Sequence, residues 1–477
     1  MLLQIRSLRP VLIVVSLLSI IILLDLSRSE SYIANRAQSI SHPLLSPYFP
    51  PDSPDLVSVA LDGTWKEDIK TVNGFNKVFE QRLEECRTGS GPCNKNQDKV
   101  VLLAWYHFRR ALEGHMQGEN VWCDAMMDAM HALGYTLLLV QNRTHFEDLW
   151  RRHHASVQLI IWEDSDFGAG AKPCLRNSTC VYAPSGLDLP VPPPNSTHLN
   201  IPIWKVFLAH WWNGPSEPLG GPFTLSPEPY NRWPDGKNGG KDNFYVGYSL
   251  ERTCLKTPFT PHAQRPRQAY VLAKSLKYFV MPSYSLPDPQ GVTENQLNDD
   301  FYANLARTNN ITWLGQFKLD EMPKELPPHP PPGITQVERM DRPAFQRLIA
   351  QSRVLFGIGR PYLSPSPYEA LCLGVPFINP VSGWDQEDPE NREKWDAQQG
   401  GLLFTGVDEP YVYHVKVGDR DGFARAVRKA METPIERFIP PDMKMSGVID
   451  RMKVLLETDW RPTALMQMEA TNYAFNE

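Results

Sequence analysis

Residues 354–380 of this 477-residue chain contain the side chains and glycines best suited by type and spacing to bind a phosphorylated ligand. An apolar run from Val354 to Gly359 has the length and composition of a buried parallel strand. After a proline-containing loop, Ser-Pro-Tyr-Glu at 366–369 predicts a helix start, with Ser366 as N-cap and Pro367 in the first turn. Parallel sheets bind phosphorylated nucleotides where a strand, a loop and a helix N-terminus meet. The segment is therefore predicted to be a donor-nucleotide site.

Several residues could bind such a nucleotide. The Glu369 carboxylate can accept hydrogen bonds from two vicinal hydroxyls, and a helix N-terminus favours its negative charge. Because Glu369 lies three residues after Ser366, the pair also fits a capping box, which requires no ligand. Gly357 and Gly359 would let a diphosphate approach the backbone closely, although a tight strand end also explains glycines there. Lys274, at the end of another predicted strand, could neutralise the diphosphate or be an ordinary surface lysine.

The segment FGIGRPYLSPSPYEALCLGVPFINP resembles the C-terminal signature of the α-1,6-mannosylglycoprotein 6-β-N-acetylglucosaminyltransferases, the N-acetylglucosaminyltransferase V family. The strand, the glycine-bounded loop, the small-Pro-x-Glu-Ala helix start and the Phe-x-Asn-Pro strand end follow in the same order without gaps. The resemblance implies a B-type glycosyltransferase fold in which Glu369 binds the nucleotide ribose. It also implies inverting transfer of N-acetylglucosamine from UDP-GlcNAc to a mannose-containing N-glycan or glycoprotein in a β-1,6 linkage.

A second, shorter resemblance concerns the catalytic base. Gly-Glu-Asn-Val-Trp at 118–122, followed by a helix that ends in Leu-Gly-Tyr at 133–135, looks like the family's segment around its catalytic glutamate. The resemblance places Glu119 on that glutamate, and an inverting transfer needs one such carboxylate to take the proton of the acceptor hydroxyl. Alternatively, Glu119 only complements the helix dipole in the first turn. Glu113, Asp124 and Asp128 are nearby rivals for the role of base.

Asp164 and Asp166 form an Asp-x-Asp pair after a predicted strand, and such a pair could hold a divalent cation beneath a diphosphate. The strand–helix pattern around it and the resemblance both favour a transferase that needs no metal. We therefore expect no metal site and no cofactor, with the UDP-sugar as the donor substrate. His210-Trp211-Trp212 shows no ligand spacing and is expected to stack on a sugar or to belong to the core.

The order of predicted elements indicates an α/β protein with two doubly wound Rossmann-like domains facing across a cleft, the B-type glycosyltransferase architecture. We expect a cytoplasmic tail and signal anchor at 1–26, a stem at 27–95, an acceptor-side domain at 96–260, a donor-nucleotide domain at 261–440, and a C-terminal helix and tail at 441–477. The hydrophobic content of 42% suffices for two cores. A net charge of −6 and the absence of a basic run argue against nucleic acid as a partner.

The N-terminus predicts attachment to a membrane. Arg6 and Arg9 precede an apolar run at 11–24, which fits an uncleaved signal anchor better than a cleaved signal peptide because no small-x-small cleavage site follows. The expected location is the Golgi membrane, as a single-pass type II protein with a lumenal catalytic part. Four N-glycosylation sequons, at Asn142, Asn177, Asn195 and Asn310, agree with this prediction.

Six of the seven cysteines lie before residue 260, and in an oxidising lumen these six could form three disulfides. Cys86–Cys93 and Cys174–Cys180 are plausible local pairs that leave Cys123 and Cys254, although six cysteines allow fifteen pairings. Cys372 is expected to be a small buried apolar residue.

Two other functions remain open from the sequence. The chain could be a B-type transferase with another sugar donor or acceptor, or a catalytically inactive lumenal protein that only binds sugars.

Overall fold

The structure, a computed structural model, describes residues 54–163, 172–183, 196–212, 219–234, 242–279, 300–318, 329–359 and 362–471. The predicted anchor at 1–26 lies outside these residues. Within the described ranges, no helix combines the length and the apolar character needed to cross a bilayer.

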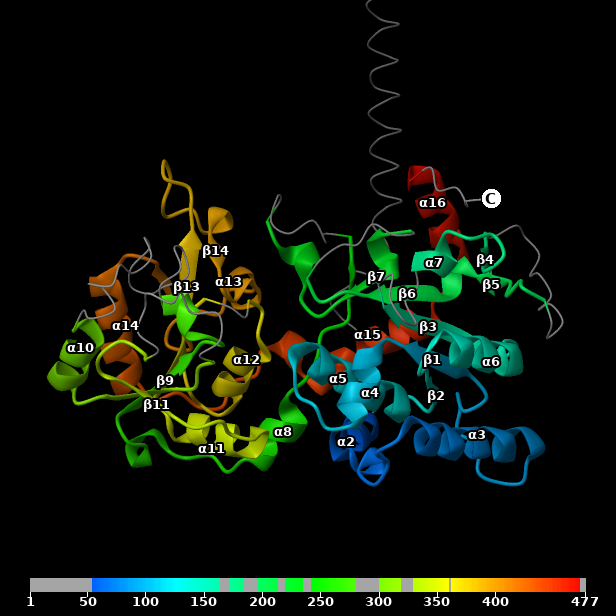
Figure 1. Cartoon of the computed structure of the whole chain (residues 1–477), viewed down its shortest axis with the longest axis horizontal. Helices are drawn as coiled ribbons and strands as arrows, with labels where there is room; N and C mark the ends of the chain where they lie inside the picture. Colours follow the sequence, from blue (N-terminus) through cyan, green and yellow to red (C-terminus); the bar gives the residue numbers. More distant parts are fainter. Residues whose placement is uncertain are drawn as a thin grey trace, which may run out of the picture. The chain divides into compact units, whose positions relative to one another are not determined.

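The first sheet has six strands, and all its neighbouring strands are parallel. Every side chain of the internal strand Val100–Ala104 is buried, as expected for a strand that is covered on both faces. In spatial order the strands are β2 (Thr136–Leu139), β1 (Val100–Ala104), β3 (Val157–Glu163), β6 (Val206–Ala209), β7 (Thr224–Ser226) and β8 (Phe244–Tyr245). The elements around it are α4 (Tyr106–Leu112), α5 (Gly118–Ala132), α6 (Arg143–His153), α7 (Lys172–Leu175) and the small ribbon β4 (Val181–Tyr182) with β5 (Ile201–Pro202) (Figure 1).

The second sheet has seven strands, of which only β14 is antiparallel to its neighbour. In spatial order they are β11 (Ile334–Gln336), β10 (Thr312–Gly315), β9 (Gln268–Leu272), β12 (Val354–Gly357), β13 (Phe377–Gly383) and β14 (Asp396–Ala397), while β15 (Val412–Lys416) also pairs with β13. Its helices are α10 (Phe301–Asn309), α11 (Arg342–Gln351), α12 (Pro365–Cys372), α13 (Gly400–Phe404) and α14 (Arg420–Glu432) (Figure 1). The predicted α/β class with two parallel sheets is thus confirmed.

Both sheets contain a point at which the order of strands along the chain reverses. In the first sheet the reversal lies between β1 and β3, and in the second it lies between β9 and β12. Connections run away from each other at such a point, so the loops beyond the carboxyl ends of those strands can hold a ligand. Lys274 follows β9, Gly357 is the last residue of β12 and pairs with Leu272 of β9, and Gly359 lies just beyond β12.

The described part of the predicted stem belongs to the first domain. Instead of a separate stem, α2 (Pro54–Asp62) and α3 (Val72–Thr88) pack on the first domain (Figure 1). Phe75, Phe79 and Leu83 form a buried stripe at helical spacing along α3. The Asn76 amide donates to the Leu139 carbonyl oxygen at 2.9 Å and accepts from the Leu139 N–H at 2.8 Å, so this helix is bonded to the edge strand β2.

The C-terminal segment contains two helices. Helices α15 (Met445–Glu457) and α16 (Arg461–Thr471) follow the second domain in sequence, but α15 packs against α5 and α2 of the first domain (Figure 1). The side chain of Gln158 donates to the Leu456 carbonyl oxygen at 2.8 Å, and the Trp460 ring lies 5.1 Å from the Phe207 ring, centroid to centroid. The chain therefore crosses back to its first domain.

Three disulfides are present among the described residues. Cys86–Cys93 and Cys174–Cys180 confirm the two predicted local pairs. Cys372 is buried as expected, but it also forms a disulfide with Cys254, so Cys254 does not pair with Cys123. Cys254 lies in α8 (Glu251–Lys256), which packs against α12 and brings two cysteines 118 residues apart to a Cα–Cα distance of 6.2 Å. Cys123 is a buried free thiol.

Candidate active site

Helix α12 begins two residues earlier than predicted. Its N-cap is Ser364, whose hydroxyl accepts from the Ser366 N–H at 3.3 Å, and Pro365 is its first residue. Ser366 and Pro367 therefore lie within the first turn, where a proline is tolerated because its missing N–H has no intrahelical acceptor. Glu369 lies beyond that turn, so the capping box expected from Ser366 and Glu369 does not form.

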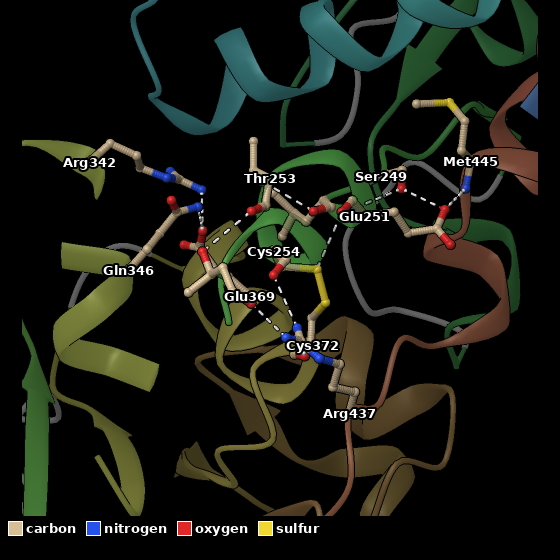
Figure 2. The surroundings of a disulfide bond; sticks show 12 residues. Ser249, Glu251, Thr253, Cys254, Arg342, Gln346, Glu369, Cys372, Arg437 and Met445 are labelled. Atoms are coloured by element: carbon tan, nitrogen blue, oxygen red, sulfur yellow. Dashed lines mark hydrogen bonds and ion pairs between the residues drawn. A yellow bond between two sulfur atoms is a disulfide. The ribbon is translucent and has the colours of Figure 1, made fainter. Parts of the chain in front are cut away.

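The Glu369 carboxylate is bound instead by α11. The guanidinium of Arg342 donates to Glu369 Oε1 at 2.8 Å, and the side-chain amide of Gln346 donates to the same oxygen at 2.5 Å. Figure 2 shows both side chains converging on Glu369, which is 1% exposed. Arg342 and Gln346 are one helical turn apart on α11, so they can reach the same oxygen.

The second carboxylate oxygen of Glu369 has no hydrogen-bond partner among the described residues. Glu369 Oε2 is buried, and no described residue donates a hydrogen bond to it. Buried polar atoms are nearly always hydrogen-bonded, so an unpartnered carboxylate oxygen calls for a donor from outside the described residues. A hydroxyl group of a ligand has the right chemistry to supply that donor.

The two glycines after β12 are required by protein packing. Gly359 has φ of +63°, and a Cβ on it would lie 2.5 Å from the Tyr278 ring. A Cβ on Gly357 would lie 1.6 Å from Oε1 of Gln398, whose amide donates to the Gly359 carbonyl oxygen at 2.7 Å. The space beside Gly357 is therefore filled by Gln398 and is not open. Contact between these glycines and a diphosphate stays a prediction.

Lys274 lies just beyond β9, at the carboxyl edge of the second sheet. Its side chain is exposed, and its carbonyl oxygen accepts from the Lys318 N–H at 3.0 Å. Because β9 and β12 are adjacent, Lys274 and the glycine loop leave neighbouring strand ends. A role in charge neutralisation stays a prediction.

Glu119 lies in the first turn of α5, close to the start of α12. A Cβ on the preceding residue, Gly118, would lie 2.8 Å from the Trp211 ring and 3.4 Å from Cδ of Pro365. Arg342 approaches from the second domain as well, since its Nη1 lies 3.5 Å from the Met116 carbonyl oxygen. The segment that carries the predicted base thus contacts the residues that surround the predicted donor site.

The Glu119 side chain is half-buried, and none of the described residues pairs with it in a salt bridge. Its neighbours include Tyr106, at the carboxyl end of β1. The pKa of Tyr106 is raised mainly by burial and further by the negative charges of Glu119 and Glu163. Glu119 is therefore at the carboxyl edge of the first sheet, beside the ends of β1 and β3.

The three rivals of Glu119 are engaged in ion pairs. Glu113 pairs with Arg109, Arg110 and His115 at the surface. Asp124 and Asp128 both pair with Lys66 and Arg252. Burial is the main cause that raises the pKa of Asp128 to about 6, with these ion pairs opposing it. Asp124 and Asp128 are each held by the same two cations, and Asp128 is only 1% exposed, so an acceptor hydroxyl cannot reach it. These contacts suit a structural role better than that of a base.

Two other predictions concern the metal pair and the tryptophans. Asp164 and Asp166 lie outside the described residues, and in the part that is described no three His, Cys, Asp or Glu side chains are grouped to hold a metal. Trp211 belongs to the core, where it stacks on Tyr248 at 5.9 Å. Trp212 is 44% exposed and remains open to a ligand.

Sequence reasoning missed three residues of the site: Arg342, Gln346 and Glu228. Arg342 and Gln346 are four residues apart, a spacing that places two side chains on one face of a helix, and this spacing could have identified them. Glu228 lies between two prolines, Pro227 and Pro229, and is fully buried. Burial raises its pKa to about 8, and the Tyr368 hydroxyl donates to its Oε2 at 3.1 Å. A lone acidic residue between prolines gives little sign of such an environment.

Comparison with known protein families gives a match in the C-terminal part of the chain. The model of Glycosyltransferase family 18 matches residues 324–471. The mouse protein named alpha-1,6-mannosylglycoprotein 6-beta-N-acetylglucosaminyltransferase B is 26% identical over 142 residues, which are 28% of this chain and 18% of that protein. The Caenorhabditis elegans alpha-1,6-mannosylglycoprotein 6-beta-N-acetylglucosaminyltransferase is 29% identical over 122 residues, or 24% of this chain and 18% of that protein. The resemblance is thereby confirmed, and the matched region is that of a glycosyltransferase, although the matches span less than a fifth of the length of these relatives.

Two solved structures are similar over most of the chain. AviGT4, a glycosyltransferase involved in avilamycin A biosynthesis, is 13% identical, with a TM-score of 0.38 and coverage of 78% of this chain and 97% of that chain. The UDP-GlcNAc 2-epimerase from Methanocaldococcus jannaschii is 10% identical, with a TM-score of 0.39 and coverage of 75% and 99%. These similarities are distant.

Proposed function

We propose that this protein is an inverting glycosyltransferase that moves N-acetylglucosamine from UDP-GlcNAc to a mannose-containing N-glycan, in a β-1,6 linkage. The observation that carries the proposal is the buried Oε2 of Glu369, which lacks a hydrogen-bond partner among the described residues and lies on a helix inside the region that matches Glycosyltransferase family 18. The names of the relatives support N-acetylglucosamine and a mannosylglycoprotein as donor sugar and acceptor.

The donor nucleotide binds at the start of α12. Glu369 Oε2 accepts a ribose hydroxyl, while Arg342 and Gln346 hold Oε1 and fix the orientation of the carboxylate. The diphosphate lies near the first turn of α12, at Ser366 and Pro367, and beside the loop of Gly357 and Gly359. The helix N-terminus favours its negative charge. Lys274 offsets the charge from the neighbouring strand end, so transfer proceeds without a metal ion.

Glu119 acts as the general base in the transfer step. Its carboxylate takes the proton from the acceptor hydroxyl, and the resulting oxygen attacks the anomeric carbon from the face opposite UDP. The new C–O bond forms as the bond to the diphosphate breaks, and UDP leaves with the electron pair. Two contacts support this role: Gly118 lies beside Pro365 of α12, and the Met116 carbonyl oxygen lies near Arg342. The segment that carries Glu119 is therefore next to α12, the helix that carries Glu369.

The proposal is tested with a lumenal fragment that begins before α2, since α2 and α3 are part of the first domain. Transfer to a mannose-terminated N-glycan is measured by mass spectrometry with a panel of UDP- and GDP-sugars. We expect turnover with UDP-GlcNAc that is unchanged by EDTA. If EDTA abolishes turnover and Mn²⁺ restores it, the metal-free mechanism is wrong. Binding of UDP without turnover of any sugar would support the inactive sugar-binding alternative, and turnover of another donor would replace N-acetylglucosamine.

We further propose that the protein is anchored in the Golgi membrane with its catalytic part in the lumen. Asn142, Asn177 and Asn310 of three sequons are exposed, so glycans could be attached to them, and Asn195 lies outside the described residues. The full chain expressed in cells should shift in mobility after glycosidase treatment and remain with membranes in carbonate. Extraction by carbonate would contradict the anchor.

A further inference from the structure

Glu228 connects the first domain to the donor helix through a buried contact. It follows β7, and its backbone is fixed because the Ser226 hydroxyl donates to the Glu228 carbonyl oxygen at 3.0 Å. The hydroxyl of Tyr368, in α12, lies 3.1 Å from Glu228 Oε2 and 3.3 Å from Oε1. A Cβ on Gly401 would lie 2.0 Å from Oε2, so α13 closes over the carboxyl group as well.

The groups that face Glu228 are phenols. Tyr230, Tyr245 and Tyr248 come from the first domain and Tyr368 from α12, and each has its pKa raised by burial and by the charge that Glu228 would carry. No described lysine, arginine or histidine pairs with this carboxyl group. Because a buried carboxylate without a cation is unfavourable, burial raises the pKa of Glu228 to about 8 and the group is protonated at neutral pH.

Tyr368 and Glu369 are consecutive residues of α12, and they are held from opposite domains. Arg342 and Gln346 of the second domain bind Glu369, while Glu228 of the first domain binds Tyr368. Displacing Tyr368 would therefore displace the carboxylate beside it. Glu228 is fully buried and is expected to touch neither donor nor acceptor.

We propose that Glu228 is a positioning residue of the donor site, which in its neutral form holds α12 in place through the Tyr368 hydroxyl. The proposal rests on the proposed function, because it takes UDP as the ligand of α12. Ionisation of Glu228 strengthens the hydrogen bond from Tyr368, but it also leaves a charge without a cation in a fully buried site. Because desolvation is the larger of the two effects, the charged group favours a conformation in which α12 moves away and water reaches the carboxylate. UDP affinity should therefore be constant at acidic and neutral pH and fall as the pH rises through the pKa of Glu228.

The test compares the parent with Glu228→Gln, Tyr368→Phe and the control Tyr230→Phe. The glutamine stays neutral and can accept from Tyr368, whereas the phenylalanine removes only the bonding hydroxyl. The Tyr230 hydroxyl donates to the Trp211 carbonyl oxygen instead, so its loss tests for a general effect on the phenol cluster. UDP affinity is measured by calorimetry from pH 6 to pH 9, and hydrogen exchange of residues 365–372 is measured without ligand.

We expect the parent to lose about tenfold in UDP affinity per pH unit above pH 8, as for one linked proton. Glu228→Gln should remove this loss, and Tyr230→Phe should keep it. Tyr368→Phe should weaken binding about fivefold at neutral pH, the effect of one lost hydrogen bond, and should speed exchange in α12. The proposal is overturned if Glu228→Gln retains the alkaline loss, or if Tyr368→Phe changes neither affinity nor exchange. A parent that does not bind UDP contradicts the proposed function, and the exchange result then decides the positioning role separately.

Discussion

The Cys254–Cys372 disulfide is expected to stabilise the fold more than either local disulfide. It closes a chain segment of 118 residues, whereas Cys86–Cys93 closes only 7. Because a closed loop lowers the entropy of the unfolded chain, the long loop stabilises the folded state by about 4.9 kcal/mol at 25 °C and the short loop by about 2.4 kcal/mol. We therefore predict that reduction of the long-range disulfide lowers the free energy of unfolding about twice as much.

The native contact between α8 and α12 should survive reduction. Nη1 of Arg437 lies 3.0 Å from the Cys254 carbonyl oxygen and 3.1 Å from that of Cys372, so it bridges the two helices independently of the sulfur atoms (Figure 2). Both thiols would also remain buried. The main effect of reduction is thus on the unfolded chain, which makes the loop-length calculation applicable.

The assay uses two variants, each with one disulfide. One keeps Cys254–Cys372 and carries alanine at the other four bonded positions, and the other keeps only Cys86–Cys93. Urea unfolding of each variant with and without a phosphine reductant gives the contribution of the retained bond, because the side chains are otherwise the same. Differences near 5 and 2 kcal/mol are expected. Equal differences in the two variants would refute the reasoning from loop length.

Three further predictions concern individual carboxyl groups. Glu119→Gln should reduce transfer about 10²- to 10⁴-fold while UDP affinity by calorimetry is unchanged, because the amide cannot take a proton; weakened UDP binding of the same size would argue against a base. Glu369→Gln should weaken UDP binding about ten- to a hundredfold, because a charge-assisted hydrogen bond is lost. The control Arg342→Lys keeps a cation beside Oε1 and should retain most of the UDP affinity. Equal UDP-induced shifts in Tm for Glu369→Gln and the parent would leave the carboxylate only a structural role. The folded pKa of Glu228 lies above the unfolded value of 4.5, so the native state holds an extra proton between the two and stability falls as pH rises in that window. Relative to Glu228→Gln, the free energy of unfolding of the parent should fall by about 1.4 kcal/mol per pH unit from pH 5 to pH 8, and parallel curves in urea titrations would contradict the buried neutral acid.

Local sequence patterns were sufficient for most of the longer strands of the two sheets, but not for the short strands β7, β8, β11 and β14. Val354–Gly357 forms a strand because it is apolar and rich in residues that favour strands. The segment of α14 forms a helix because its apolar residues recur at helical spacing, and Asp419 caps its start. The two disulfides that close short loops were also predictable, since their cysteines cannot be far apart in any fold. The start of α12 was harder to predict, because Ser364 and Ser366 both precede a proline. Only the backbone conformation shows that Ser364 is the N-cap.

The site itself depends on contacts between residues far apart in the chain. The sequence placed Glu369 on a helix, but only packing of α11 against α12 gives its carboxylate to Arg342 and Gln346 and leaves Oε2 without a partner among the described residues. Likewise, Cys372 looked like a small core residue until the packing of α8 brought Cys254 beside it. Glu228 is the extreme case, because its pKa is set by burial among phenols from both domains. Sequence determines which segments can form a strand or a helix, whereas desolvation and pairing of a carboxyl group arise only when distant segments exclude water together.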